Sequence, residues 1–308
     1  MKIALCFIIN YEHILNKEHI WREWIEHNKD IINVYFYYKD LRKIKSNWII
    51  EHTLPPNLIY ETSYLQVMPA YISILKFAMN QDSQNKWFCM LTDSCCPIIS
   101  PKKFRYLFYK NYNFSLFSWK EAWWNPYYHQ RANLAKLPKE LWLANDPWFI
   151  LTKENVKQVI QFVATHKPIA QTICSGGLAN ETIFAVIFKY YKELNTNSHI
   201  ICTSTHIADW YRRSSKTSPH VFKYADKDDI EFIDKELKRN LYHIFIRKIA
   251  PEFPDDILKH YIYEHDKEKD EKLVLIEPIE MIYNRYKSKC FSILVVIVIS
   301  YLMRILLL

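Results

Sequence analysis

The chain has 308 residues, of which 50% are hydrophobic and 24% are charged, and its formal net charge is +8 at pH 7. This composition excludes a disordered protein and allows one large hydrophobic core or two small ones. The positive charge favours anionic partners, but basic and acidic residues alternate without a long basic block, so a phosphorylated small molecule fits better than a nucleic acid.

Short apolar runs alternate with helical patterns in the first half of the chain, which predicts an α/β fold with a mixed central sheet and flanking helices. The start KIALCFII is a short apolar run and is expected to form a buried first strand. It has a single lysine and no small-residue cleavage site, so it does not resemble a signal peptide. Ser100 before Pro101 predicts a helix N-cap, and Asn180 is expected to cap a helix that starts at Glu181. The expected strands are residues 3–9, 34–38, 87–91, 114–117, 149–151 and 244–249, and the expected helices are residues 18–27, 69–79, 101–109, 153–165, 181–194 and 229–239.

An aromatic-rich segment over residues 119–148 contains five tryptophans mixed with polar and basic residues. Such a surface suits stacking against sugar rings, and ordinary packing is the alternative because aromatic residues also dominate cores. Within it, Arg131 and Lys136 are candidates for binding hydroxyls or acidic groups of a glycan acceptor. The alternative for these two residues is a basic loop without a binding role.

Only two glycines occur, Gly176 and Gly177, whereas a chain of this length would usually have about 20. One adjacent pair cannot supply the dinucleotide fingerprint G-x-G-x-x-G or the phosphate loop G-x-x-x-x-G-K-[ST]. Because glycine allows positive φ and the close approach of a ligand, the pair predicts a built site before Glu181 or, alternatively, a plain turn. The seven cysteines lack C-x-x-C spacing and are expected to be reduced core thiols in the cytosol, not zinc ligands.

The last 18 residues, FSILVVIVISYLMRILLL, contain one charge and follow the basic segment RYKSK. A helix of this length rises about 27 Å, which suffices for the hydrocarbon core of a bilayer. We therefore expect a single-pass membrane anchor over residues 289–308, with a hydrophobic docking helix as the alternative. The basic flank would stay on the cytoplasmic side and leave the main domain, residues 1–263, in the cytosol, joined to the anchor by a charged linker over residues 264–288.

Seven segments spread over residues 1–252 together resemble one family. They are KIALCFII with VYFYYKD, WFCMLTDSCCPIISPKKF, ELWLANDPWFILTKENVKQV, ANETIF, HIADW, SPHVF and FIRKIAPEF. Each is similar, in the same order, to a motif of the core-2/I-branching β-1,6-N-acetylglucosaminyltransferases, the peptide O-xylosyltransferases and their plant relatives. The resemblance implies a single A-type glycosyltransferase domain that transfers a sugar, most simply N-acetylglucosamine, from a UDP-sugar with inversion and without a metal.

The resemblance also implies roles for individual residues. ANETIF matches the family's catalytic glutamate at Glu181, and FIRKIAPEF aligns Lys248 with a diphosphate-binding lysine. The positive end of a helix would keep Glu181 ionised, so partial burial would be needed to keep it basic. The full set of expected site residues is Glu181 as the catalytic base; Lys248, Arg247 and Lys216 (or Arg213 in place of Lys216) at the donor diphosphate; Asp40, Asp93 and Ser94 at the donor nucleotide; Arg131, Lys136, Trp148 and Trp210 at the acceptor or sugar; and Gly176 and Gly177 as structural residues.

The chain also departs from the family. Asn180 stands where the family has aspartate before the glutamate, and Tyr38 stands where it has histidine. Most A-type transferases bind a metal through an Asp-x-Asp pair, whereas the strand end here offers Asp93, and the literal D-x-D at Asp226 and Asp228 is expected to begin a helix. The sequence thus predicts no metal and no cofactor, a UDP-sugar as co-substrate, a glycan or glycoprotein acceptor, and no nucleic-acid partner. A catalytically inactive carbohydrate-binding or membrane scaffold protein of the same fold is the alternative.

Overall fold

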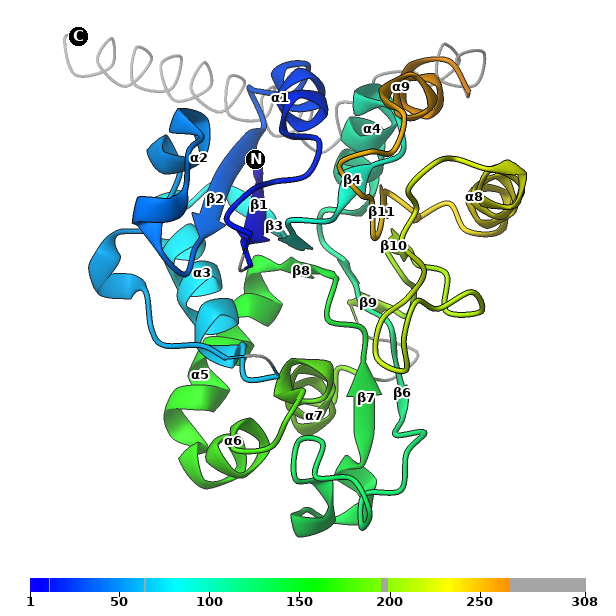
Figure 1. Cartoon of the computed structure of the whole chain (residues 1–308). Helices are drawn as coiled ribbons and strands as arrows, with labels where there is room; N and C mark the ends of the chain where they lie inside the picture. Colours follow the sequence, from blue (N-terminus) through cyan, green and yellow to red (C-terminus); the bar gives the residue numbers. More distant parts are fainter. Residues whose placement is uncertain (11, 64, 195–198, 266–308) are drawn as a thin grey trace, which may run out of the picture.

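The computed structural model describes residues 1–10, 12–63, 65–194 and 199–265, and Figure 1 shows their arrangement. Within these ranges the chain forms a six-stranded mixed sheet with the order β2-β1-β3-β8-β5-β9. Its strands are β1 Lys2–Ile8, β2 Ile32–Tyr37, β3 Asn85–Thr92, β5 Ser115–Leu116, β8 Ile150–Thr152 and β9 Ile200–Ile201. The helices are α1 Glu18–Glu26, α2 Asn47–Glu51, α3 Met68–Gln81, α4 Pro101–Asn111, α5 Lys153–Thr165, α6 Lys167–Cys174, α7 Ile183–Tyr190, α8 Lys227–Arg239 and α9 Asp255–Tyr263.

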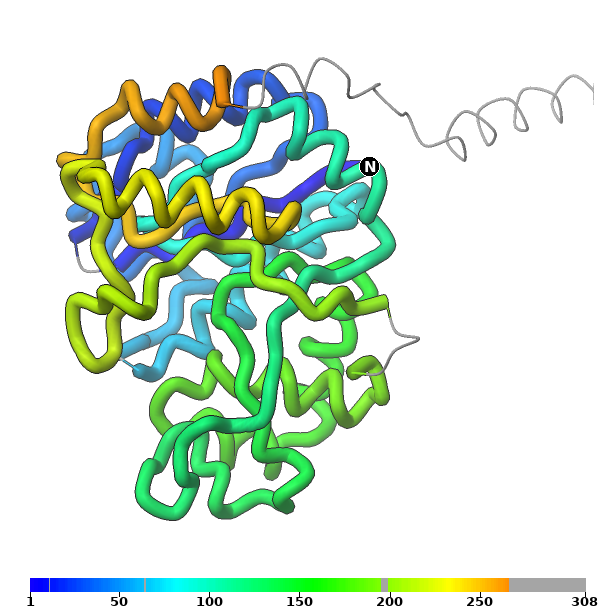
Figure 2. Tube along the Cα trace, turned by 90° about the vertical axis from the view of Figure 1, so that its right-hand side faces the viewer, coloured from blue at the N-terminus to red at the C-terminus, as the bar shows by residue number. Residues whose placement is uncertain are grey.

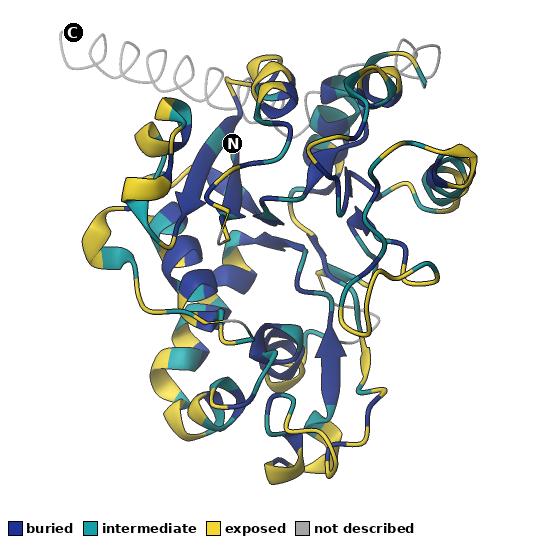
Figure 3. Cartoon of the chain, in the orientation of Figure 1, coloured by how far each residue is buried: buried dark blue, intermediate teal, exposed yellow. Residues whose placement is uncertain are grey.

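The strand β1, which lies between β2 and β3, contributes to a hydrophobic core on each face of the sheet. It pairs in parallel with β2 and β3, whereas β8 runs antiparallel to β3 and β5. Because successive side chains of a strand point to opposite faces, Ile3, Leu5 and Phe7 pack with α1, α4 and α9, while Ala4 and Cys6 pack with α3, α5 and α7. All five side chains are fully buried, and Figure 3 shows the strands buried beneath the exposed outer faces of the helices. The predicted buried first strand is therefore confirmed.

A small second sheet joins distant parts of the chain. It contains β10 His206–Ile207, β11 Phe245–Ile246 and β4 Cys96–Pro97, with β11 parallel to β10 and antiparallel to β4. Figure 2 shows α8, in yellow, alongside the yellow-green segment that leads to β10. A two-stranded sheet of β6 Trp119–Glu121 and β7 Leu143–Asn145 lies at one end of the molecule. The small sheet matters for function because the residues that follow β11 meet the turn between β3 and β4.

The predicted α/β class is confirmed, and each predicted strand and helix overlaps an observed element. Local signals succeeded at two helix starts. Ser100 Oγ accepts a hydrogen bond from the Lys103 N–H at 3.0 Å, and Asp226 caps α8 by accepting from the Asp229 N–H at 2.8 Å. The prediction missed the helices α2, α6 and α9 and the strands β4, β6, β7, β9 and β10. These strands have two or three residues each, which is too short to carry a periodic pattern.

The predicted helix start at Glu181 is wrong. A 3₁₀ turn, Ala179–Glu181, precedes α7, and the backbone at Leu178 (φ 56°) and Thr182 (φ −145°) breaks the helix on both sides of that turn. Asn180 does not cap α7, because its side-chain amide donates to the Tyr71 hydroxyl at 3.5 Å. Glu181 therefore lies before the helix, and burial, not the helix end, dominates its environment.

The cysteines in the described ranges are free thiols. The predicted reducing setting stays a prediction. Cys6, Cys89, Cys95 and Cys96 are buried, but Cys202 is exposed and does not belong to a core. No helix in the described part of the chain has the length and apolarity to cross a bilayer. The predicted anchor over residues 289–308, and the linker from residue 266 onward, lie outside that part and stay predictions.

Candidate functional site

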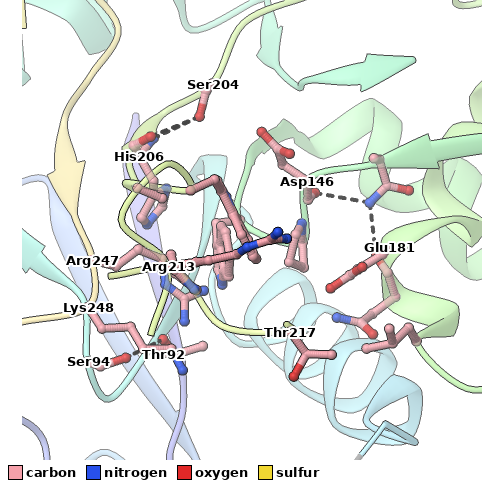
Figure 4. Close-up of a pocket in the computed structure, with 18 of the residues that line it drawn as sticks. Thr92, Ser94, Asp146, Glu181, Ser204, His206, Arg213, Thr217, Arg247 and Lys248 are labelled. Atoms are coloured by element: carbon pink, nitrogen blue, oxygen red, sulfur yellow. Dashed lines mark hydrogen bonds between the residues drawn. The ribbon is translucent and has the colours of Figure 1, made fainter. Parts of the chain in front are cut away.

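A pocket of about 900 Å³ opens at the carboxyl ends of β1 and β3, where Ile8, Thr92 and Asp93 line it. Its other walls come from the β7–β8 connection, the 3₁₀ turn before α7, the loop over residues 204–219 and the residues after β11. Figure 4 shows these segments converging on the cavity. Its lining includes seven lysine and arginine residues but four carboxylates, so the pocket favours an anionic ligand. The lysines and arginines are Lys120, Arg131, Arg213, Lys216, Arg239, Arg247 and Lys248.

Arg247 is the most buried of these cations, with 5% of its surface exposed. Its guanidinium carbon lies 3.4 Å from the centroid of the Trp148 ring. Nε and Nη1 have no hydrogen-bond partner among the described residues. Burial lowers the pKa of Arg247, yet an arginine side chain stays charged, so a charged residue of the pocket lining has two buried donors without a partner. Burying unpaired donors is costly, and an anionic or polar ligand would offset that cost.

Lys248 adds a second cation beside Arg247. Its Nζ donates to Ser218 Oγ at 2.7 Å, and burial together with the neighbouring Arg247 lowers the pKa of the lysine. The backbone fixes its position, because the Ile249 N–H donates to the Ser94 carbonyl oxygen at 2.9 Å. Lys248 and Ser94, which the sequence assigned separately to the donor diphosphate and the donor nucleotide, thus lie close together in space.

The exposed residues Arg213 and Lys216 come from the loop that follows β10. Asp209, which is 1% exposed, holds the start of this loop: its carboxylate accepts from the Tyr211 N–H at 2.8 Å and from the Arg212 N–H at 3.0 Å. Asp209 itself does not line the pocket. Its effect on the site is to shape the loop that carries the two exposed cations.

Asp93 and Ser94 line the pocket at the end of β3, as predicted. The Asp93 carboxylate accepts from the Asn10 N–H at 3.2 Å, and 6% of the residue is exposed. Burial raises the pKa of Asp93 to about 6, against an ordinary value of 3.8. A carboxyl that takes up a proton near neutral pH repels a bound phosphate less than an ionised one does.

Glu181 lies on the opposite wall and pairs with Arg131, whose Nη2 donates to Glu181 Oε2. Burial raises the pKa of Glu181, and the charge of Arg131 opposes that rise. The expectation that burial offsets any loss of basicity is therefore met, although no helix end is involved. Arg131 was expected to contact an acceptor; the structure gives it a carboxylate partner instead.

The glycine pair does not supply positive φ; Leu178 does, with φ 56°. A Cβ on Gly176 would lie 2.5 Å from the Asn133 nitrogen and 2.8 Å from Ala132 Cα, so the missing side chain admits another backbone segment. The Ala132 N–H donates to the Gly177 carbonyl oxygen at 2.8 Å. The pair thus docks the backbone next to Arg131 onto the turn that carries Glu181, and does not line the cavity.

Two predicted site residues, Asp40 and Lys136, do not line the pocket. Asp40 follows β2, the edge strand, and caps a 3₁₀ turn where its carboxylate binds Arg42 at 3.0 Å, so it is one strand away from the pocket. Lys136 ends the 3₁₀ turn Leu134–Lys136, which buries Leu134 and leaves the lysine exposed and outside the pocket lining. Neither is positioned for the role that the sequence predicted.

The two predicted tryptophans differ. Trp148 lines the pocket, but Arg247 covers its ring at 3.4 Å, so this face supports the arginine and is closed to a sugar. Trp210 is 48% exposed and lines the pocket, as does Trp123, which is 59% exposed. Two cations lie over the ring of Trp123, with Lys120 Nζ at 4.4 Å and the guanidinium carbon of Arg131 at 5.3 Å from its centroid. In the described part of the chain, Trp210 is therefore the more open ring at the pocket, and it is the one that the sequence selected.

Sequence reasoning missed three polar residues of the lining. Burial raises the pKa of Asp146, and it lowers the pKa of His206, whose Nε2 has no partner in the described ranges. Asn145 Nδ2 donates to the Asn180 carbonyl oxygen at 2.9 Å, which ties β7 to the turn of Glu181. Asn145 and Asp146 stand in the segment NDPW, and His206 stands in HIADW. Other residues of these two segments, namely Trp148 and Trp210, were predicted as site residues.

Within the described ranges, no group of three or more histidine, cysteine, aspartate or glutamate side chains is arranged to hold a metal ion. No protein-family model matches the chain, and no curated protein matches its sequence. Among solved structures, it is similar to the 4-diphosphocytidyl-2C-methyl-D-erythritolsynthase from Anaerococcus prevotii DSM 20548, with 10% identity and a TM-score of 0.37 over 77% of this chain and 99% of that chain. A likeness at this level says nothing of function.

The glycine pair gives a matched test. Gly176→Ala should lower the free energy of unfolding by about 1–3 kcal/mol, because the added methyl meets backbone atoms that cannot move aside. Gly177→Ala should be nearly neutral, because its Cβ would meet Leu65 at 3.7 Å, an ordinary contact. Urea unfolding of both variants measures the difference, and equal losses would contradict the role given to Gly176.

Asp93 predicts a pH-dependent stability. Its pKa rises on folding from 3.8 to about 6, so its proton stabilises the folded chain below about pH 4, and this contribution is lost as the pH rises through 6. Asp93→Asn keeps an acceptor for the Asn10 N–H without a charge, so the variant should gain stability relative to the wild type as the pH rises. The gain between pH 5 and pH 8 should be about 1–2 kcal/mol, because the rest of the change lies below pH 5. Urea unfolding at both pH values measures this gain; a difference independent of pH would contradict it.

Proposed function

We propose that this chain is an inverting glycosyltransferase that moves a sugar from a UDP-sugar to a hydroxyl of a glycan or glycoprotein without a metal ion. N-acetylglucosamine is the first candidate sugar and xylose the second. The observation that carries the proposal is the buried, unpaired guanidinium of Arg247 beside Lys248, in one pocket with the carboxylate of Glu181. The seven ordered motifs that resemble the branching transferases agree with it.

The cations supply the chemistry at the donor. When the bond between the sugar and UDP breaks, its electron pair stays on a diphosphate oxygen, and negative charge builds up there. Charge-assisted hydrogen bonds from the free nitrogens of Arg247 and from Lys248 would stabilise that charge. Their fixed positions, with Arg247 held on Trp148 and Lys248 next to it, reduce the reorganisation needed during the reaction.

Glu181 supplies the chemistry at the acceptor. Its carboxylate would take the proton of the acceptor hydroxyl as that oxygen attacks the anomeric carbon on the face opposite UDP. The raised pKa makes it a stronger base than an exposed glutamate, and a positioned base of this kind contributes about 10²–10⁴ in rate. The exposed ring of Trp210 at the pocket offers a stacking surface for a sugar.

The base is tested with Glu181→Gln in the full chain, assayed with UDP-sugars in the presence of EDTA. The variant should lose at least about 100-fold in kcat and retain UDP affinity, because the amide keeps the shape of the side chain but cannot take the proton. Release of UDP and binding calorimetry measure the two quantities. Full activity in the variant would overturn the assignment, and UDP binding without transfer in the wild type would favour the non-catalytic alternative.

The diphosphate site is tested by binding of UDP to Arg247→Met and Lys248→Ala. Each should weaken UDP about tenfold or more, because each removes a charge-assisted hydrogen bond. Lys136→Ala is the control, since it removes an equal charge that lies outside the pocket. An unchanged dissociation constant for Arg247→Met would remove the buried guanidinium from the site.

A further inference from the structure

We infer that Arg131 is a positioning residue that fixes the Glu181 carboxylate in the pocket through an ion pair, and that it does not serve as an acceptor contact. The inference deepens the proposed function and rests on the role of Glu181 as base. Arg131 would act on the reaction only through this carboxylate. It thereby becomes part of the machinery without touching either substrate.

The ion pair leaves one half of the carboxylate available. Arg131 Nη2 bonds to Oε2 of Glu181, and no hydrogen bond from the described residues reaches Oε1. The side chains are 26% and 22% exposed, respectively, so solvent screens the pair less than it would on an open surface. One oxygen is thus held by the arginine, while the other is free to meet an acceptor hydroxyl.

Arg131 is itself held from several directions. Its guanidinium carbon lies 4.3 Å from the ring centroid of Trp124 and 5.3 Å from that of Trp123, and Trp124 is 8% exposed. Its backbone pairs with Gly177 in an isolated parallel bridge. These contacts hold the guanidinium against Glu181 and leave Nε without a partner among the described residues. This arrangement is the one expected of a residue that supports the carboxylate.

The ion pair with Arg131 affects the pKa of Glu181. Burial and the carboxylate of Asp146 raise the pKa of Glu181, whereas Arg131 and Arg247 lower it. Arg131 is the largest of the lowering influences. Removing its charge therefore leaves burial and Asp146 opposed only by Arg247, and Glu181 should hold a proton at higher pH, where it cannot act as a base.

The inference is tested by titrating Glu181 with ¹³C-glutamate NMR in the full chain, where Glu181→Gln identifies the resonance. Arg131→Met should raise the pKa of Glu181 by about 1–3, the range typical of losing a neighbouring opposite charge. Arg131→Lys keeps the charge and should restore most of the difference. Lys139→Met is the control. Lys139 is exposed, lies in the same connection between β6 and β7 as Arg131, and does not line the pocket, so its replacement should leave the pKa of Glu181 unchanged. If Arg131→Met fails to fold, Arg131→Gln replaces it with the same expected rise.

A purely structural role predicts a different result. Arg131 would then lower stability when replaced without moving the titration, and an unchanged pKa of Glu181 in a folded Arg131→Met or Arg131→Gln variant would overturn the inference. In the active enzyme, the acid limb of kcat/KM should move upward by the same amount as the titration, with KM for the UDP-sugar unchanged. If the wild type transfers no sugar, the proposed function fails, but the titration still decides whether Arg131 sets the ionisation of Glu181.

Discussion

The buried guanidinium of Arg247 constrains the whole pocket. Arg247 is only 5% exposed, stacks on Trp148 and has two nitrogens without a hydrogen-bond partner. Burying such a charge is costly unless an anion pairs with it. The field of Arg247 also reaches the other titrating groups, since it lowers the pKa values of Lys248, His206 and Glu181. The donor side and the acceptor side of the proposed reaction are thus coupled through one side chain.

The fold explains how this residue reaches the mouth of the main sheet. Arg247 follows β11, which is hydrogen-bonded to β4 just after the turn at the end of β3. Two segments 150 residues apart, paired at Cys96 and Ile246, therefore meet at one edge. The carboxyl ends of parallel strands commonly form a ligand crevice at such an edge in α/β proteins. On the opposite wall, a glycine without a Cβ lets a second loop dock, and that contact joins Arg131 to Glu181. Both walls depend on backbone pairing between distant segments.

The sequence predicted what depends on local pattern. Residues 153–165 show helical periodicity and form α5 over that range, and Ser100 caps its helix because a cap needs only its next three residues. The predictions from the sequence were wrong where the role of a residue depends on which distant residues pack against it. Asp40 was predicted at the donor nucleotide, but it follows β2, which is the edge strand of the sheet. Trp148 was predicted to contact a sugar, but Arg247, which is 99 positions later in the sequence, covers its ring. The ion pair of Arg131 carried no sequence signal, since its partner is 50 residues away.

We propose that protein cations, with Arg247 foremost, hold the donor diphosphate in place of a metal. The most direct measurement is a crystal structure of the full chain with UDP, grown in EDTA. We expect diphosphate oxygens at about 3 Å from guanidinium nitrogens of Arg247 and from Lys248 Nζ. Diphosphate density elsewhere in the molecule, or UDP that binds only when a divalent ion is supplied, would contradict it.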